Sequence, residues 1–250
     1  MRFVDQVVLV TGGGSGIGRA AAEAFAAEGA TVAVAGRSAE PLAQTVKLVE
    51  SGGGTASFVV ADVTREDDVA ALVETVVRRH GGLHVAFNNA GVFVGGGVAD
   101  LSLAEWSRAV DANLTGTWLS MKHEIAHMRS HGGGTIVNTA SNLGAHARRP
   151  GISAYVATKA AVSALTRNAA LEHVSDGIRI NAVSPGPVDT PMSLLPGETP
   201  ADRASRLRSA LPIGRVGTLA EVTSAVLWLA SAESGFTVGH DLVLDGGATA

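Results

Sequence analysis

The sequence predicts an α/β fold in which a doubly wound, parallel sheet is covered by helices on both faces. Short runs rich in β-branched residues alternate with alanine-rich segments along all 250 residues. Most of these runs are continuously apolar, which is typical of parallel strands that are buried on both sides. The length and the apolar content of 46% favour one domain, residues 1–250, with a sizeable core.

Strands and helices can be assigned in order along the chain. The seven predicted strands are 6–11, 31–36, 55–60, 83–88, 135–140, 178–183 and 241–246. The first helix is expected over 17–28, where apolar residues recur at helical spacing. Capping-box patterns that begin at Thr64, Ser102 and Thr218 indicate the starts of later helices. Six of the eight prolines fall within 185–217, which predicts a long loop there and a substrate lid at about 187–212.

Composition excludes several classes of partner. A net charge of −4 offers no basic surface to nucleic acid or to an anionic membrane. The chain has no cysteine, so disulfides and thiolate metal sites are excluded. No run approaches the roughly 18 apolar residues of a membrane span. The N-terminal "MRFVDQVVLVTGGG" is typical of an early strand rather than a signal peptide, and we expect a cytoplasmic protein.

A glycine-rich turn follows the first strand. "VTGGGSGIGRAAA" places Gly12, Gly16 and Gly18 where a strand passes into a helix, an arrangement that binds the pyrophosphate of a dinucleotide. At the end of the second strand, Arg37 stands near the position of the carboxylate that would bind a ribose 2′-hydroxyl. This favours NADP(H) over NAD(H). NAD(H) stays an alternative, because Ser15 stands where a second basic residue could have supported the phosphate.

An ordered set of motifs resembles the short-chain dehydrogenase/reductase family over nearly the whole chain. The set is "TGGGSGIG" (11–18), "NNAG" (88–91), Asn113, Ser141, "YVATK" (155–159) and "SPGPVDT" (184–190). The resemblance implies a seven-stranded Rossmann sheet, a nicotinamide cofactor, a small carbonyl or alcohol substrate, and a homotetramer or homodimer.

The resemblance also implies which residues contact the cofactor. The phosphate turn would consist of Gly12, Ser15, Gly16, Ile17 and Gly18. The adenosine end would contact Arg37, Asp62, Val63, Asn89, Ala90 and Gly91. The nicotinamide end would contact Tyr155, Lys159, Pro185, Gly186, Val188 and Thr190.

Tyr155, the only tyrosine, is the expected general acid/base. A phenol has an ordinary pKa near 10, and a nearby cation lowers it. Lys159 lies one helical turn on, so we expect it to lower the pKa of Tyr155. Ser141 would hold the substrate oxygen, and Asn113 would support a water that links Lys159 to solvent. Ser141 and Tyr155 are 14 residues apart, one more than is common in the family, which predicts an extra residue in the loop between them.

Two other functions deserve weighing. "HEIAH" (123–127) matches a zinc-protease motif, but zinc needs a third ligand and no acidic residue occurs over 128–171. We therefore expect no metal. A catalytically idle dinucleotide-binding module is the second alternative. The presence of both Tyr155 and Lys159 favours an enzyme, and a turnover assay separates the two.

Three features near the expected pocket stay open on the sequence alone. Arg148 and Arg149 either bind an anionic substrate group or form a solvated pair. His146 either reaches the pocket or points elsewhere. The apolar residues of the expected lid either cover an apolar substrate or pack into the core; they are Met192, Leu194 and Leu195.

Overall fold

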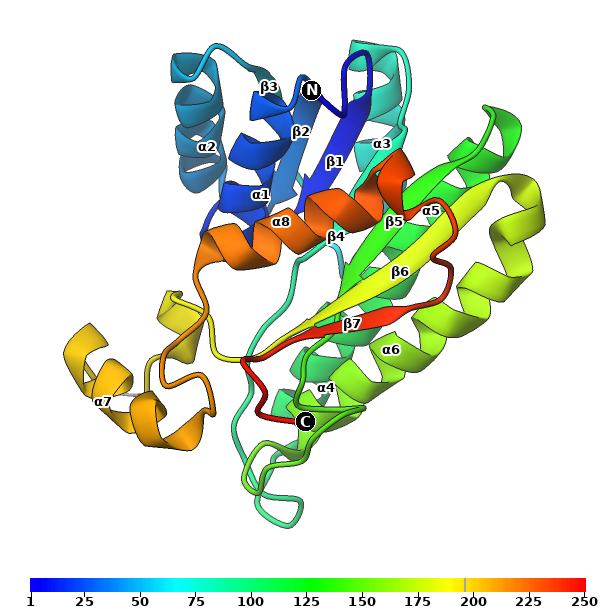
Figure 1. Cartoon of the computed structure of the whole chain (residues 1–250). Helices are drawn as coiled ribbons and strands as arrows, with labels where there is room; N and C mark the ends of the chain where they lie inside the picture. The colour runs from blue at the N-terminus through cyan, green and yellow to red at the C-terminus, as the bar shows by residue number, and fades with distance from the viewer. Residues whose placement is uncertain (196) are drawn as a thin grey trace.

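Seven parallel strands form one sheet in the order β3-β2-β1-β4-β5-β6-β7 (Figure 1). The strands are β1 (Val7–Thr11), β2 (Thr31–Gly36), β3 (Thr55–Val60), β4 (Val85–Asn88), β5 (Gly134–Thr139), β6 (Ile178–Pro185) and β7 (Asp241–Leu244). This computed structural model describes residues 1–195 and 197–250, so Pro196 of the expected lid lies outside the described residues. From β1 the strand order continues through β2 and β3 to one edge of the sheet, and from β4 it continues through β5 and β6 to β7 at the other edge. In such sheets, ligands usually bind at the carboxyl ends of the strands where the order reverses.

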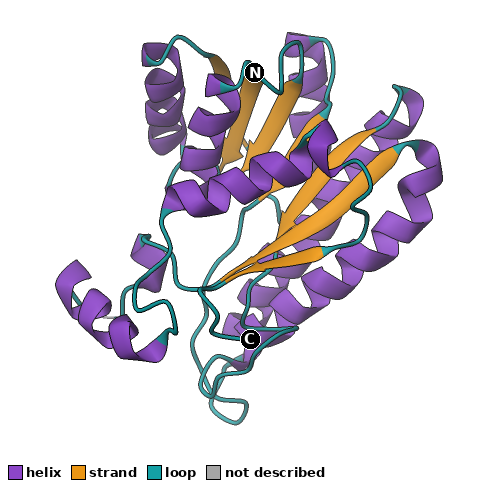
Figure 2. Cartoon of the chain, in the orientation of Figure 1, coloured by secondary structure: helices purple, strands orange, loops and turns teal. Residues whose placement is uncertain are grey.

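Helices cover both faces of the sheet (Figure 2). One face carries α1 (Gly16–Ala27), α2 (Ala39–Ser51) and α8 (Leu219–Ala230), and the other carries α3 (Glu66–His80), α5 (Gly116–Ser130) and α6 (Ser153–His173). Shorter elements are α4 (Leu103–Ala109), α7 (Pro200–Ala210), the π-helix η1 (Val110–Thr115) and the 3-10 helices η2 (Val174–Asp176), η3 (Pro191–Ser193) and η4 (Ala232–Ser234). Within the described residues, none of the helices combines the length and apolarity needed to cross a bilayer.

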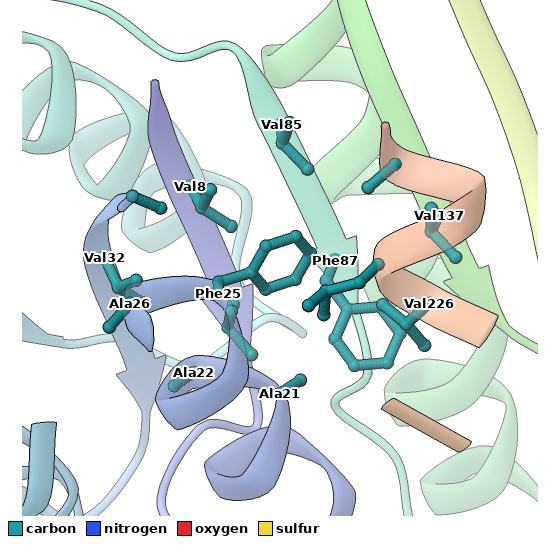
Figure 3. Close-up of a cluster of buried hydrophobic side chains, with 14 of the residues drawn as sticks. Val8, Ala21, Ala22, Phe25, Ala26, Val32, Val85, Phe87, Val137 and Val226 are labelled. Carbon is teal, nitrogen blue, oxygen red and sulfur yellow. The ribbon is translucent and has the colours of Figure 1, made fainter. Parts of the chain in front are cut away.

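The two hydrophobic cores follow from the alternation of side chains along the strands. Val8 faces α1 and α8, whereas Val7 faces the opposite helical layer. Phe25 of α1, Phe87 of β4 and Val226 of α8 meet over the first face, as Figure 3 shows. Because both faces are covered, the inner strands are largely apolar. The predicted fold class and the seven strands are confirmed, with ends that differ by at most two residues.

Two of the three predicted capping boxes are confirmed, at Ser102 before α4 and at Thr218 before α8. The third is wrong. α3 begins at Glu66 after Arg65, and the Thr64 hydroxyl instead donates to Asp62 Oδ1 at 2.8 Å. Thr64 therefore closes a turn at the end of β3 rather than starting the helix.

The proline-rich segment 185–217 is not a loop throughout, because it contains η3 and the three-turn helix α7. Thr199 and Asp202 form a capping box, and Pro200 occupies the first turn, where its missing N–H costs nothing. Met192 and Leu195 of this segment are exposed, so the alternative that they pack into the core is wrong. Leu194 is half-buried.

Candidate active site

The glycine-rich turn between β1 and α1 has room for backbone only. Gly12 and Gly16 adopt φ values of 65° and 51°, a region that favours glycine. A Cβ added to Gly18 would lie 2.3 Å from the Gly12 carbonyl oxygen. Ser15 precedes α1 without a side-chain cap among the described residues, and the first turn carries no acid, so the helix N-terminus can receive an anion. Ile17 packs its side chain against the core.

Two side chains outside the motif hold this turn in shape. Thr45 of α2 donates to the Gly13 carbonyl at 2.8 Å. Arg19 of α1 donates to the Gly14 carbonyl at 2.5 Å and to Thr45 Oγ1 at 3.0 Å. Sequence analysis missed both residues, because nothing in a single sequence tells which helix residues fold back onto a loop.

Asn89 and Ala90 dock on the carboxyl end of β1. Their backbone amides donate to Thr11 Oγ1 at 3.1 and 3.2 Å, and the Asn89 side chain reaches the carbonyls of Thr11 and Gly12. A Cβ on Gly12 would lie 2.9 Å from Ala90 Cα. The "NNAG" segment and the phosphate turn are therefore packed together at the carboxyl ends of β1 and β4.

Asn113 lies in the π-helix η1, an irregularity that is frequent at functional sites. Its amide nitrogen donates to the Val92 carbonyl at 3.0 Å and to Thr158 Oγ1 at 3.2 Å, and its Oδ1 accepts from the Val92 amide at 2.7 Å. A Cβ on Gly91 would lie 3.0 Å from Asn113 Oδ1 and 3.6 Å from Lys159 Nζ. Because residue 91 has no side chain, the side chains of Asn113 and Lys159 can approach the backbone at Gly91.

Tyr155 and Lys159 lie one turn apart on α6, and Ser141 follows β5. The Tyr155 hydroxyl lies close enough to the buried side chain of Ser141 for Ser141 to act on the pKa of the phenol. Ser141 Oγ also accepts the Leu143 amide at 3.1 Å, which fixes the hydroxyl at the start of the loop. The extra residue is absorbed between Ser141 and α6, since the two hydroxyls still meet.

The electrostatics of this pair differ from the sequence prediction. Burial raises the pKa of Tyr155, and the hydrogen bond with Ser141 only opposes that rise. Lys159 is itself buried, which lowers its pKa to about 8, and its Nζ donates to the Thr139 carbonyl at 2.6 Å. The predicted lowering of the Tyr155 pKa by Lys159 is therefore not found among the protein's own groups, where Ser141 rather than Lys159 opposes the effect of burial.

Asp62, Val63 and Arg37 lie beyond the ends of β3 and β2. Burial acts to raise the pKa of Asp62, but hydrogen bonds from Thr64 and the charges of Arg37 and Arg65 hold it below its ordinary value. Arg37 is exposed and forms no ion pair among the described residues. Val63 packs against the start of α5. An exposed guanidinium therefore stands near the Asp62 carboxylate.

The segment after β6 leads back over the phosphate turn. Pro185 ends the strand, and Gly186 donates its amide to the last residue of β7 at 2.9 Å. Val188 is buried in the core. The Thr190 methyl lies 3.4 Å from the position of a Cβ on Gly16. Residues far apart in the sequence are thus brought together at the carboxyl edge of the sheet.

Arg203 is a further residue that sequence analysis missed. Its side chain is buried at the base of α7 and donates to Asp189 Oδ1 at 2.5 Å, to Ser193 Oγ at 2.9 Å and to the Thr190 carbonyl at 3.2 Å. α7 is therefore tied to the chain that crosses the phosphate turn. In the sequence Arg203 is one arginine among other polar residues, because its burial becomes visible in the structure alone.

The side chains of "HEIAH" diverge rather than converge on a metal. Glu124 is fully buried in the core. His123 Nε2 lies 3.7 Å from Glu66 Oε1, and the His127 ring stacks on His131 with centroids 4.0 Å apart. The geometry gives the motif no shared ligand position.

The loop before α6 holds the two arginines and the histidine whose roles the sequence left open. Arg148 and Arg149 are exposed, in keeping with a solvated pair. His146 Nε2 lies 2.9 Å from Asp241 Oδ2, and Asp241 also accepts from Ser163 and Ser184. His146 thus fastens the loop to β7 through a buried carboxylate.

Comparison with known proteins shows to which family the chain belongs. The family model described as enoyl-(acyl carrier protein) reductase matches residues 12–249. The chain is 41% identical to cis-4-hydroxycyclohexanecarboxylate dehydrogenase of Sinomonas cyclohexanicum, covering 99% of this chain and 98% of that protein. It is 39% identical to cyclohexanol dehydrogenase of Acinetobacter sp., covering 99% and 96%. The crystal structure of levodione reductase superposes with a TM-score of 0.94 at 35% identity, covering 99% of both chains. The chain is an oxidoreductase that belongs to the short-chain dehydrogenase/reductase family.

Proposed function

We propose that this enzyme transfers a hydride between NADP(H) and the carbonyl or secondary alcohol of a small alicyclic substrate. The observation that carries the proposal is the position of the Tyr155 hydroxyl beside the buried Ser141 side chain, one helical turn from Lys159. These groups stand at the same edge of the sheet as the glycine-rich turn. The dinucleotide supplies or accepts the hydride when it is bound. The protein must then handle the proton of the substrate oxygen.

Tyr155 is the proposed proton donor and acceptor. Because its pKa is raised, the phenol stays protonated at neutral pH and is ready to give its proton to a ketone oxygen. In the opposite direction the phenol must first lose that proton, so alcohol oxidation is expected to speed up as the pH rises. Ser141 donates a hydrogen bond to the substrate oxygen and holds it beside Tyr155 as charge develops.

In this proposal, Lys159 and Asn113 support Tyr155 by binding the cofactor and by connecting the site to solvent. Lys159 binds the nicotinamide ribose, and with a pKa of about 8 it exchanges protons easily near neutral pH. Asn113 supports a water that links Lys159 to solvent. Its side-chain amide is already engaged with Val92 and Thr158, so the backbone carbonyl, which accepts one bond from Thr117, is the group left for that water.

The proposed cofactor contacts lie along the carboxyl edge of the sheet. Gly12, Ser15, Gly16, Ile17 and Gly18 hold the pyrophosphate, supported by the free amides of α1. Asp62, Val63, Asn89, Ala90 and Gly91 line the adenosine side, and Pro185, Gly186, Val188 and Thr190 line the nicotinamide side. Exposed Arg37 after β2 favours a 2′-phosphate, hence NADP(H) over NAD(H).

The substrate proposal combines the relatives with the lid. Two relatives are named for reactions of cyclohexane alcohols. Residues 187–212 form the proposed lid, in which exposed Met192 and Leu195 offer apolar surface. Arg203 joins α7 to Asp189 and Thr190, so the two parts of the proposed lid are held together.

We also propose that the chain assembles as a homodimer or homotetramer. Leu103 and Trp106 of α4 and Trp118 of α5 are large apolar side chains that are 79%, 42% and 46% exposed. A second subunit would remove this surface from water. Light scattering on the eluted protein tests the proposal, and a monomer at micromolar concentration would contradict it.

The experiment for the main proposal follows absorbance at 340 nm. Purified protein is mixed with NADP⁺ or NAD⁺ and cyclohexanol, and with NADPH or NADH and cyclohexanone. The expected result is turnover with a preference for the phosphorylated dinucleotide, and faster alcohol oxidation at pH 9 than at pH 7. Binding of dinucleotide without turnover on any of a wide set of secondary alcohols and ketones would contradict it.

A further inference from the structure

Phe93 is an apolar ring without a place in the core. It is 45% exposed, although its neighbour Val94 is 2% exposed. Its ring lies against Tyr155, with centroids 5.2 Å apart and planes inclined by 52°. An exposed aromatic side chain beside a reactive hydroxyl is surface that a ligand can cover.

The chain around Phe93 is fastened to the helix that carries Tyr155. Val94 packs against Ala154 in a small buried cluster. Gly96 donates its amide to the Gly151 carbonyl at 2.7 Å, and its carbonyl accepts the Ser153 amide at 3.1 Å. Phe93 therefore holds a fixed position relative to the phenol rather than sampling the surface of a free loop.

The backbone before Phe93 is bonded to Asn113, whereas the Phe93 ring stays half-exposed. Val92 engages Asn113 through both backbone groups, which uses the segment before Phe93 for scaffolding. A Cβ on Gly95 would lie 3.9 Å from Phe93 Cε1, so the glycine two positions on places no side chain against the ring. The Phe93 ring is therefore half-exposed beside Tyr155, while the adjoining Val94 is buried.

We propose that Phe93 is a specificity-determining residue that forms an apolar wall of the substrate pocket and selects ring-shaped alcohols and ketones. The inference rests on the proposed function of the site. A flat aromatic face can cover one side of a six-membered ring while Tyr155 reaches its oxygen. A short acyclic alcohol presents too little apolar surface to use the wall. Phe93 should therefore raise kcat/KM for cyclic substrates alone.

The test compares cyclohexanol with 2-propanol in wild type, Phe93→Ala and Phe93→Leu. Phe93→Ala should lose about tenfold or more in kcat/KM for cyclohexanol, mainly through KM, and stay within about twofold for 2-propanol. Phe93→Leu should recover part of the loss. Phe236→Ala is the matched control, because Phe236 is fully exposed elsewhere on the surface.

The outcomes separate the two proposals. Equal losses on both alcohols in Phe93→Ala would show that Phe93 only supports Tyr155, and would overturn the specificity role while the proposed function stands. Unchanged kcat/KM on cyclohexanol would overturn it as well. A wild-type enzyme that turns over 2-propanol but no cyclic alcohol would overturn both the substrate proposal and this inference.

Discussion

A buried carboxyl in the core makes stability depend on pH in a direction that is unusual for an acid. Glu124 of α5 is fully buried, and its Oε2 accepts Asn88 Nδ2 at 2.9 Å. The same nitrogen lies 3.1 Å from Asn138 Oδ1. Glu124 Oε1 and Asn88 Oδ1 have no partner among the described residues. With one hydrogen bond and no cation beside it, the carboxylate form is poorly stabilised.

Burial raises the pKa of Glu124 from its ordinary 4.5 to about 7. The folded state then binds the proton more tightly than the unfolded chain does. The contribution of Glu124 to the free energy of unfolding is therefore fully present below about pH 4.5. It is lost as the pH rises through about 7, and at higher pH the free energy of unfolding no longer changes because of this group. A difference of about 2.5 pKa units at about 1.4 kcal/mol each corresponds to about 3 kcal/mol.

Glu124→Gln keeps the shape of the side chain and removes the ionisation. Its amide can also donate to the unpartnered Asn88 Oδ1. Relative to wild type, the variant should gain about 3 kcal/mol in free energy of unfolding between pH 4.5 and 8, or about 6–12 °C in Tm. The measurement is urea unfolding followed by tryptophan fluorescence at several pH values.

Exposed Glu50→Gln serves as the control and should leave the pH dependence unchanged. The reasoning is refuted if the stability difference between wild type and Glu124→Gln stays flat across this pH range. It is also refuted if the variant is the less stable protein at pH 8.

Two predictions concern the cofactor. Arg37→Asp should shift kcat/KM from NADP(H) toward NAD(H) by about tenfold or more, because a carboxylate repels the 2′-phosphate and can bind the 2′-hydroxyl; an unchanged ratio would show that Arg37 does not contact the phosphate. Gly18→Ala would place its Cβ 2.3 Å from the Gly12 carbonyl, so dinucleotide affinity should fall at least tenfold, with a loss of about 1–3 kcal/mol in stability. Gly52→Ala, at φ −82° and in ordinary contact, should change neither; equal effects at both glycines would contradict the steric argument.

The sheet and the ends of its strands were predictable from the sequence, because burial on both faces leaves continuous apolar runs such as "VVLV" and "TVAVAG". The cleft was predictable for a related reason. Motifs that follow successive parallel strands, such as those at Gly12, Asn89 and Ser141, must meet at one edge. Strand order and register then bring together residues that lie more than 100 positions apart.

What the sequence did not reveal depends on where individual side chains point. α7 lacks apolar periodicity, and it is held by Arg203 rather than by a hydrophobic face. The pKa of Tyr155 depends on burial and on Ser141, while Lys159 donates to the Thr139 carbonyl. Helical spacing places the ammonium on the right face of α6 but does not fix its hydrogen-bond partner.

The central claim is that the Tyr155 hydroxyl handles the proton in the reaction, and Tyr155→Phe tests it most directly. The variant keeps the ring beside Phe93 and removes only the hydroxyl that meets Ser141. We predict that kcat for cyclohexanone reduction falls by about 10²–10⁴, while the Kd of NADPH, measured by its fluorescence on binding, changes less than about threefold. Turnover close to that of wild type with normal NADPH binding would contradict the claim.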